Sequence, residues 1–417
     1  MLACSFLALR RGYDAQMDWD DFRRALASER LPCALVDLDA LERNVDRVRA
    51  RIAGTGRTVR VASKSVRHRG VLRRVLERGG DAFRGLLCYS ADEAAWLASQ
   101  GFDDLLIAYP TVQHASLDAV AQKVALGANI RCIVDSSDHL EALGAAARRA
   151  SITLDAVLDL DVSYRPLGGR AHLGVRRSPL RSADDVGALA RAAKSVPGVR
   201  MVGLMAYEAH VAGLPDASAS AGAAKNAAAR ALKSLAIPAV RALRGAAVSA
   251  MRVECPDAAL VDGGGTGSIE ITAADPVVTE VAVGSGFLCS HLFDGYAGLD
   301  LEPAQFFALE VARVPDRDHV TCAYGGYVAS GTPGLDRLPM PWSPRGLAWI
   351  GLEGAGEVQS PLRVDRAERR PRVGDPVIFR HAKAGEMAER FREYLMVRGG
   401  VIEAREPTYR GDGVCFG

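Results

Sequence analysis

One lysine lies directly after the first of a series of short β-branched runs. Lys64 is found in Val61-Ala-Ser-Lys-Ser-Val-Arg-His68. The chain has 52 basic residues, of which the only lysines are Lys64, Lys123, Lys194, Lys225, Lys233 and Lys383. A strand-end salt bridge is the alternative role for Lys64, but this sequence normally uses arginine where a positive charge suffices. Unlike a guanidinium, an amine condenses with an aldehyde, and burial lowers its pKa enough for it to react. We therefore predict that Lys64 is a nucleophilic amine.

A second motif, rich in glycine, follows a strand much later in the chain. It reads Val261-Asp-Gly-Gly-Gly-Thr-Gly-Ser268, and it is neither a P-loop nor a GxGxxG sequence. Consecutive glycines let backbone N–H groups surround an anion, and Thr266 and Ser268 add hydroxyl donors. Gly284-Ser-Gly286 would be the second half of such a cradle. A tight turn with positive φ is the alternative, but three glycines followed by Thr-Gly exceed what a turn needs.

The two motifs together predict one cofactor. The lysine calls for an aldehyde and the glycine loop calls for a phosphate. Pyridoxal phosphate carries both groups.

The elements that must position these motifs alternate between strand-like and helix-like periods. Short apolar runs predict eight strands, at Thr58–Ser63, Phe83–Tyr89, Leu105–Tyr109, Ile130–Asp135, Leu154–Val162, Met201–Tyr207, Ala258–Asp262 and Thr279–Val283. Apolar residues three and four apart predict helices between them, at Val71–Glu77, Ala91–Ala98, Leu140–Ala150, Ala183–Ala193 and Ala217–Ala229. Eight βα units over about 230 residues favour a closed (β/α)8 TIM-type barrel, with a doubly wound sheet as the alternative. In such a barrel Lys64 and the glycine loop share one rim, and phosphate sites follow strands seven and eight.

The pattern changes after residue 295, where strands are separated by turns rich in Gly, Pro and charge. They are expected at Phe306–Val314, His319–Ala329, Leu347–Leu352, Val377–Phe379 and Tyr394–Arg398. We predict three parts: an N-terminal extension with a helix over 1–32, the barrel over 33–295, and a C-terminal antiparallel β domain over 296–417.

Composition limits the class and compartment of the protein. The chain has 417 residues, of which 49% are hydrophobic and 24% charged, and a formal net charge of +2. These values fit a soluble globular protein and give no electrostatic case for binding nucleic acid or an anionic membrane. The eight cysteines show no zinc-ligand spacing, and no apolar run reaches the roughly 20 residues that span a bilayer. Residues 1–9 lack a preceding basic region, so they do not predict a signal peptide. We expect a cytoplasmic protein that starts at Met17.

The order of the motifs resembles a known family. Val36-Asp-Leu-Asp-Ala-Leu-Glu-Arg-Asn44, the Lys64 motif, Gly203-Leu-Met-Ala-Tyr-Glu-Ala-His210, the glycine loop and Gly284-Ser-Gly286 with Asp294 occur as in fold-type III pyridoxal phosphate enzymes. The sequence is most similar to the D-threonine aldolase and D-serine dehydratase branch, related to alanine racemase, over nearly the whole chain. The resemblance implies an alanine-racemase-like barrel with a C-terminal β domain, an amino-acid substrate, and a homodimer whose partner residues complete each site.

The resemblance also implies roles for individual residues. Lys64 would carry the cofactor as a Schiff base and later act as acid and base at Cα. Those that would hold the phosphate are Gly264, Gly265, Thr266, Gly267 and Ser268. Tyr207 would lie near the pyridine nitrogen, with a core tyrosine as the alternative. Either Arg170 or His172 would approach the ring hydroxyl.

The metal motif of the branch is broken in this chain. The branch holds a divalent metal with His-x-Cys or His-x-Asp after a Val-Gly-Asp turn, and here the turn at Val373 is followed by His381-Ala-Lys383. A protonated lysine cannot ligate a metal and repels one. We expect the Lys383 ammonium to take the metal's place, polarising a β-hydroxyl or binding the substrate carboxylate, or neutral Lys383 to act as a second base. A surface lysine is the alternative, and His381 would be a ligand only if a metal binds.

These observations predict a pyridoxal-phosphate-dependent lyase acting on a D- or β-hydroxy amino acid, by aldol cleavage or dehydrative deamination. An amino-acid racemase is the alternative, with bases on both faces of Cα: Lys64 and one of His210, His172 or Lys383. A non-catalytic pyridoxal phosphate carrier is a third possibility, against which the C-terminal domain argues.

Overall fold

The computed structural model describes residues 16–364, 367 and 369–417. Eight parallel strands close into a barrel in the order in which they occur along the chain, and the last pairs with the first. The strands are β2 Thr58–Ala62, β3 Phe83–Cys88, β4 Leu105–Ile107, β5 Ile130–Val134, β6 Leu154–Asp159, β7 Val199–Ala206, β8 Leu260–Gly263 and β9 Glu280–Val283. The predicted (β/α)8 barrel is confirmed, and the doubly wound sheet is ruled out by the β9–β2 pairing.

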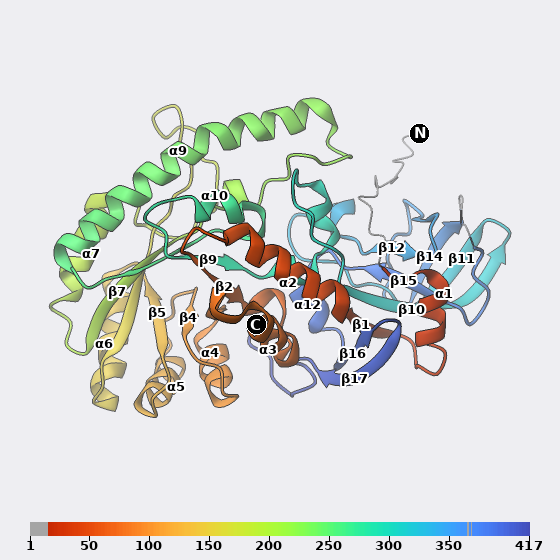
Figure 1. Cartoon of the computed structure of the whole chain (residues 1–417), viewed down its shortest axis with the longest axis horizontal. Coiled ribbons are helices and arrows are strands. Elements are labelled where there is room, and N and C mark those ends of the chain that lie inside the picture. Colours follow the sequence, from red (N-terminus) through yellow and green to blue (C-terminus); the bar gives the residue numbers. More distant parts are fainter. Residues whose placement is uncertain (1–15, 365–366, 368) are drawn as a thin grey trace.

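Helices follow the strands and cover the outside of the barrel (Figure 1). They are α3 Arg69–Gly79, α4 Ala91–Ser99, α5 His114–Ala125, α6 Ser137–Ala150, α7 Ala183–Ala193, α9 Gly222–Glu254 and α10 Ile269–Ala273. Three of them begin after a serine whose hydroxyl accepts an N–H group of the first turn: Ser90, Ser136 and Ser182. These caps satisfy otherwise unpaired N–H groups and mark where the turn at the rim ends.

The helix α9 is longer than the sequence predicts. The alanine-rich run predicts a helix over 217–229, but α9 begins at Gly222 and runs for 33 residues with Pro238 inside it. It packs against α7 and extends past the barrel (Figure 1). Its interior carries Arg244, which is only 1% exposed, so this helix contributes a buried charge to the barrel rim.

A second sheet of nine strands stands beside the barrel. Its strands are β1 Cys33–Asp37, β10 Gln305–Asp316, β11 His319–Ala323, β12 Met340–Ser343, β13 Leu347–Trp349, β14 Gln359–Val364, β15 Pro376–Arg380, β16 Glu393–Arg398 and β17 Val401–Pro407. All their pairings are antiparallel except that of β1 with β16. The predicted C-terminal β domain is confirmed. The barrel does not start at residue 33 as expected, because β1 pairs with β10 and β16 in the second sheet. A single apolar run in the sequence does not indicate which strands it will pair with.

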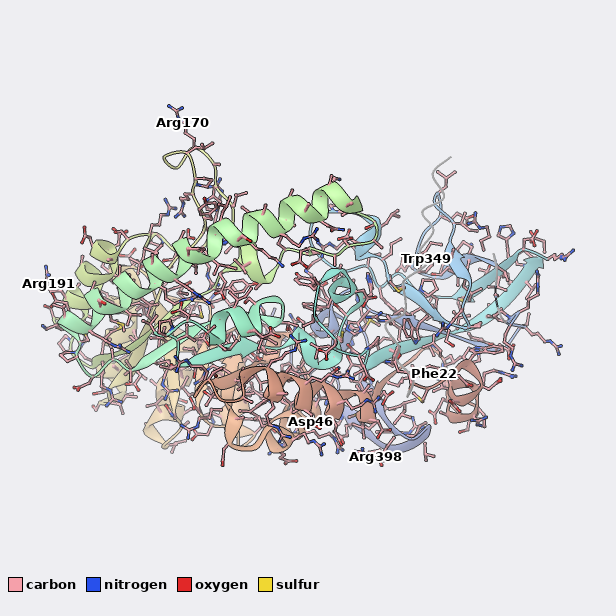
Figure 2. All side chains as sticks on the ribbon, turned by 45° about the horizontal axis from the view of Figure 1, so that its top comes forward. Phe22, Asp46, Arg170, Arg191, Trp349 and Arg398 are labelled. Carbon is pink, nitrogen blue, oxygen red and sulfur yellow. The ribbon has the colours of Figure 1, made fainter. Side chains whose placement is uncertain are left out.

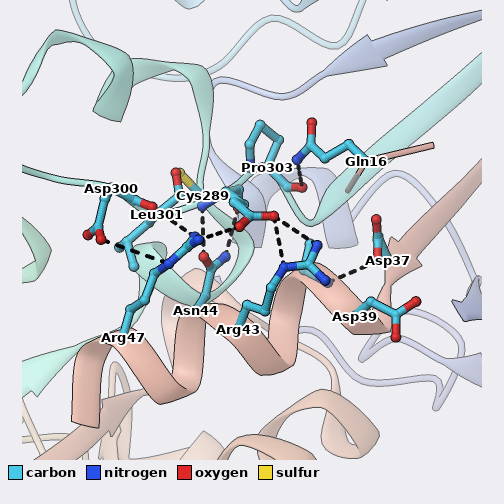
Figure 3. Close-up of polar contacts among 12 residues, drawn as sticks. Gln16, Asp37, Asp39, Arg43, Asn44, Arg47, Cys289, Asp300, Leu301 and Pro303 are labelled. Carbon is cyan, nitrogen blue, oxygen red and sulfur yellow. Dashed lines mark hydrogen bonds and ion pairs between the residues drawn. The ribbon is translucent and has the colours of Figure 1, made fainter. Parts of the chain in front are cut away.

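The helix α2 Leu38–Ile52 joins the two parts (Figure 3). Asn44 Nδ2 donates to the carbonyl oxygens of Phe287 and Glu302 at 3.0 and 2.7 Å, and its Oδ1 accepts from the Glu302 N–H at 2.7 Å. Arg43 Nε donates to the Glu302 carboxylate at 3.0 Å. This fully buried asparagine connects Phe287, which follows the last barrel strand, to Glu302, which precedes β10 of the second sheet.

Short elements complete the described chain: α1 Trp19–Ala25, α8 Ala209–Ala212, α11 Ser285–Leu288, α12 Ala384–Ala388 and the 3₁₀ turns η1 Ser63–Ser65, η3 Thr266–Ser268 and η4 His291–Gly295. The helix expected in the N-terminal extension is α1, and residues 1–15 of that extension lie outside the described part. The described helices include none with the length and apolarity to cross a membrane.

Candidate active site

A hollow opens where the barrel strands end. Its wall includes Lys64 and Ser65 of η1, residues 264–266 of the glycine loop, and Gly284 and Ser285 after β9. Lys64 and the glycine loop, which lie far apart in the sequence, therefore face one cavity. The (β/α)8 closure that pairs β2 with β9 brings them together.

Lys64 reaches into the hollow beside Tyr109, which follows β4. Its Nζ lies 3.2 Å from the Tyr109 hydroxyl and 5.5 Å from the centre of that ring. Burial disfavours the phenolate, but the Lys64 ammonium and Arg177 outweigh it and lower the pKa of Tyr109. Tyr109 is absent from the predicted site residues, although it is the last residue of the predicted strand Leu105–Tyr109.

Arg177 is the arginine that the loop between β6 and α7 directs into the hollow. Its Nε donates to Asp159 Oδ2 at 2.9 Å, and its guanidinium lies 5.6 Å from the centre of the Tyr109 ring. Burial raises the pKa of Asp159 to about 6, even though Arg177 opposes the shift. Arg177 is absent from the predicted site residues, because nothing in the sequence distinguishes it from the other arginines of this loop.

Arg170 and His172 lie elsewhere on the same loop. A two-residue bridge between Tyr164 and Leu173 turns the loop tip outward, and Arg170 stands exposed on it (Figure 2). His172 is half-buried, and its Nε2 has no hydrogen-bond partner in the described chain. Neither lines the hollow, whereas Arg177 does.

Only part of the glycine loop faces the hollow. Gly264, Gly265 and Thr266 line the hollow, whereas Gly267 and Ser268 do not. Gly264 has φ +81°, which glycine adopts most easily. A Cβ at Gly267 would come within 2.1 Å of the Ala212 carbonyl oxygen. The second and fourth glycines thus serve backbone geometry and close packing.

The buried carboxylate of Glu208 holds this loop from behind. Its Oε2 accepts from the Gly264 N–H at 3.1 Å, and its Oε1 accepts from the Ser268 hydroxyl at 3.2 Å and from the Thr272 hydroxyl. Arg244 of α9 donates to Oε2 at 2.7 Å. Ser268, predicted to hold phosphate, is therefore used to shape the loop. Glu208 lies inside the family motif Gly203–His210, but no role is predicted for it from the sequence.

Tyr207 follows β7 and lines the hollow next to the loop. Burial raises the pKa of its phenol to about 12, so it is neutral. A Cβ at Gly265 would lie 3.3 Å from the Tyr207 ring. The loop and this ring are therefore in close contact, which agrees with a place for Tyr207 in the cavity rather than in the core.

His381 and Lys383 lie on the side of the C-terminal domain and do not line the hollow. His381 follows β15; burial first and Arg380 second lower its pKa to about 3, and its Nδ1 lies 3.1 Å from the Gln305 carbonyl oxygen. Lys383 Nζ donates to the Ser330 hydroxyl at 2.8 Å and lies 3.2 Å from Glu386. The helix α12 packs on η1, since a Cβ at Gly385 would lie 1.8 Å from the Lys64 carbonyl oxygen. Lys383 is thus held at the edge of the turn that carries Lys64.

This donor set does not fit a divalent metal. The Gln305 carbonyl oxygen on Nδ1 leaves Nε2 of His381 as its one possible ligand atom. The residue two positions on is a lysine, which offers no lone pair when protonated. In the described residues, groups of three or more His, Cys, Asp or Glu side chains that could hold a metal ion are absent.

An eight-stranded barrel with an amine and a glycine loop on one rim, joined to a largely antiparallel sheet, defines a protein of the alanine-racemase-like class. The chain belongs to the family described as alanine racemase, N-terminal domain, whose model matches residues 36–262. Membership of this family implies pyridoxal phosphate as the cofactor.

Individual relatives agree with this assignment. The chain is 28% identical to a D-threonine aldolase of Arthrobacter sp. over 383 residues, which is 91% of this chain and 92% of that protein. A match to the 3-hydroxy-D-aspartate aldolase of Paracoccus denitrificans is 27% identical over 177 residues and spans only 42% of each chain. Among solved structures, the D-threonine aldolase of Filomicrobium marinum has a TM-score of 0.75 at 21% identity, covering 93% of this chain and 96% of its own. The D-threo-3-hydroxyaspartate dehydratase of Delftia sp. HT23 has 0.72 at 20%, covering 92% and 98%.

The residues of the hollow fit pyridoxal phosphate. One wall offers the amine of Lys64. Another part of the wall is the glycine loop, where a Cβ at Gly264 would lie 2.9 Å from Thr272 Oγ1 and one at Gly265 would lie 3.3 Å from the Tyr207 ring. The first N–H groups of the turn η3 have no partner inside that turn, as at any helix start, and suit an anion.

Proposed function

We propose that this protein is a pyridoxal-phosphate-dependent lyase acting on a D-configured or β-hydroxy amino acid. The observation that carries the proposal is the placement of Lys64 and residues 264–266 on the wall of one hollow. The D-threonine aldolase of Arthrobacter sp., which is similar along most of the chain, supports the choice of a lyase and of this substrate class.

Each residue of the hollow has a proposed task. Lys64 would hold the aldehyde carbon of the cofactor. The loop of Gly264, Gly265 and Thr266 would surround its phosphate, while the Gly264 N–H is bound by Glu208 and the Gly265 N–H by the Ser268 hydroxyl. Arg177 and Tyr207 would flank the ring. When bound, pyridoxal phosphate supplies an acceptor for the electron pair of the bond that breaks at the substrate's Cα.

Proton transfer falls to the side chains around Cα. For dehydration, the Lys64 amine takes the Cα proton and the β-hydroxyl leaves as hydroxide, which the resulting ammonium protonates to water. For aldol cleavage, Lys64 takes the proton of the β-hydroxyl as the Cα–Cβ bond breaks and returns it to Cα. Tyr109, whose hydroxyl lies 3.2 Å from Lys64 Nζ, orients the amine and shares its proton, because a lowered phenol pKa strengthens that exchange.

Lys383 takes part as a fixed cation. An ammonium has three N–H donors; one is given to Ser330 and one faces Glu386. Lys383 does not line the hollow, so its third N–H would reach the β-hydroxyl or a carboxylate only of a substrate that extends to the edge of the Lys64 turn. Metal analysis of purified protein and a Lys383→Ala variant test this role. Stoichiometric zinc or manganese together with an unaffected variant would refute it.

A racemase is the second candidate, and His210 is the observation that favours it. Burial lowers the pKa of His210, which keeps the imidazole neutral. Neither of its ring nitrogens has a hydrogen-bond partner among the residues that the structure describes. A neutral, unpaired imidazole three residues after Tyr207 would be the acceptor on the second face of Cα, although His210 is not among the residues that line the hollow.

One experiment decides between these functions. Purified protein is first tested for a visible absorption band. Borohydride should then fix the cofactor covalently, and peptide mapping should locate the modified residue at Lys64. A panel of D- and L-amino acids is then scored for aldehyde, ammonia and loss of chirality. Aldehyde or ammonia from a β-hydroxy amino acid supports the lyase, loss of chirality alone supports the racemase, and a band without turnover leaves a carrier. We further propose a homodimer, which the mass of the protein in solution tests.

A further inference from the structure

Residues 67–69, which lie one position beyond the Lys64 turn η1, are each bound by the C-terminal domain. Arg67 Nη1 donates to Glu389 at 2.8 Å. His68 is fully buried and stacks on Tyr394, with ring centres 5.2 Å apart. Arg69 forms a two-bond pair with Asp412, at 2.7 and 2.5 Å. The sequence motif that carries Lys64 therefore continues into a contact surface that the proposed chemistry does not use.

The segment 408–417 closes over this surface. The Tyr409 N–H donates to the Arg67 carbonyl oxygen at 3.0 Å. The Tyr409 ring lies against Trp96 of α4, with centres 4.9 Å apart. Tyr409 is itself fully buried, so the segment reaches between η1 and α4 rather than lying on the outside.

The Tyr409 hydroxyl meets a buried carboxyl there. It donates to Glu93 Oε1 at 2.9 Å, and Glu93 Oε2 accepts from the Tyr89 N–H at 2.8 Å. Glu93 has no exposed surface. A carboxyl taken out of water is costly unless its oxygens are hydrogen-bonded. Glu93 therefore holds Tyr89 and Tyr409 together.

These contacts lead directly to the proposed cofactor lysine. Tyr89 lines the hollow, and the Arg67 guanidinium lies over its ring at 4.6 Å. Arg67 Nε in turn donates to the carbonyl oxygen of Lys64 at 3.2 Å. The position of the Lys64 backbone thus depends on Arg67. Tyr409 binds the Arg67 carbonyl oxygen, and the Arg67 guanidinium packs on Tyr89, whose N–H is bound by Glu93.

We propose that Glu93 and Tyr409 are positioning residues, and that their hydrogen bond, made where the segment 408–417 closes on the barrel, fixes the turn that presents Lys64 to the cofactor. This inference rests on the proposed pyridoxal phosphate site. It assigns a task in that site to the C-terminal domain, within a single chain.

The test compares Tyr409→Phe with Thr408→Val. Thr408 is also fully buried, but its hydroxyl bonds the Phe391 carbonyl oxygen and the Gly411 N–H, both in the C-terminal domain. Each variant loses one buried hydroxyl from the same segment, so both should unfold at lower urea concentration. Only Tyr409→Phe should weaken cofactor binding, by about fivefold, the equivalent of one hydrogen bond. It should also change the pH dependence of the visible band.

Glu93→Gln and Asp412→Asn extend the test. Asp412→Asn weakens the pair with Arg69 at a partly exposed position, so it remains informative if a buried variant does not fold. We expect it to weaken cofactor binding in the same direction. Equal cofactor affinity and an unchanged band in Tyr409→Phe and Asp412→Asn, beside a wild type that binds cofactor, would overturn the positioning role. A wild type without any cofactor would instead overturn the proposed function.

Discussion

Glu208 Oε2 lies 3.1 Å from the amide nitrogen of Gly264 and accepts its hydrogen. The same oxygen accepts from Arg244 at 2.7 Å, and both side chains are 2% exposed. The shape of the glycine loop is therefore set by an ion pair that is buried behind it. Because Arg244 comes from α9, the long helix on the outside of the barrel positions the inner wall of the site.

Replacing Glu208 with alanine should destabilise the protein strongly. The change leaves Arg244 buried with Asp275 as its remaining ionic partner, so the loss should approach but stay below the roughly 3–5 kcal/mol of a buried pair broken outright. Urea unfolding of the cofactor-free protein measures the loss. Glu270→Ala is the matched control, because Glu270 pairs with Arg51 at the surface, where an ion pair is worth at most about 1 kcal/mol. Equal losses in the two variants would contradict the role assigned to Glu208.

Two glycine-to-alanine changes should have opposite signs. Gly267→Ala places a Cβ 2.1 Å from the Ala212 carbonyl oxygen, so the backbone must move, and overpacking of this kind costs roughly 1–3 kcal/mol. Gly245 lies within α9, where an added Cβ would meet nothing within 4 Å, so Gly245→Ala should stabilise the helix by about 0.5–1 kcal/mol. Thermal unfolding of both variants checks the signs, and weaker cofactor uptake is expected for Gly267→Ala alone.

Much of this arrangement follows from the sequence. Lys64 ends a β-branched run, and the glycine loop ends another, so the barrel rule that parallel strands share a rim predicts their meeting. The eight strands carry strong local signals because each is a short apolar run between helical stretches. The scarcity of lysine also separates Lys64 from the many arginines.

Other features depend on partners that are distant in the sequence. Arg177 faces the hollow and Arg170 faces solvent because the Tyr164–Leu173 bridge turns the loop between them. Lys233 would be expected to be a solvated helix charge, yet it is buried and its Nζ lies 2.9 Å from Asp216. Which arginine points inward and which lysine is covered are decided by tertiary packing, for which local composition holds no signal.

Arg177→Ala should impair the site while Arg176→Ala should not. Arg177 lines the hollow and is fixed by Asp159 at 2.9 Å, whereas its neighbour Arg176 is exposed. Loss of an oriented, charged hydrogen-bond donor at a reacting site costs about 2.7–4 kcal/mol, or a factor of roughly 10²–10³ in kcat/KM. Steady-state kinetics and the visible spectrum measure this effect. Similar losses in both variants would point to the general charge of the loop instead.

Glu93 should make the stability of the protein fall as the pH rises. Burial raises the pKa of its carboxyl from 4.5 to about 7, against the opposing effects of Tyr89, Ser63, Tyr409 and Arg67. Between these two values the folded protein keeps a proton that the unfolded chain has lost. The contribution of Glu93 is therefore full below about pH 4.5 and declines until the pH passes about 7.

Urea unfolding of wild type and Glu93→Gln at about pH 5 and about pH 8 measures this contribution. The variant cannot titrate, so the difference in free energy of unfolding between the two proteins should change by a few kcal/mol in the variant's favour at the higher pH. The buried histidines His68, His291 and His381, whose pKa values are lowered chiefly by burial, affect both proteins alike and cancel in the difference. Glu270→Gln, at the surface, should track the wild type across the same range. If the curves of wild type and Glu93→Gln run parallel, Glu93 is ionised throughout and the Tyr409 hydroxyl is bound by a permanent carboxylate.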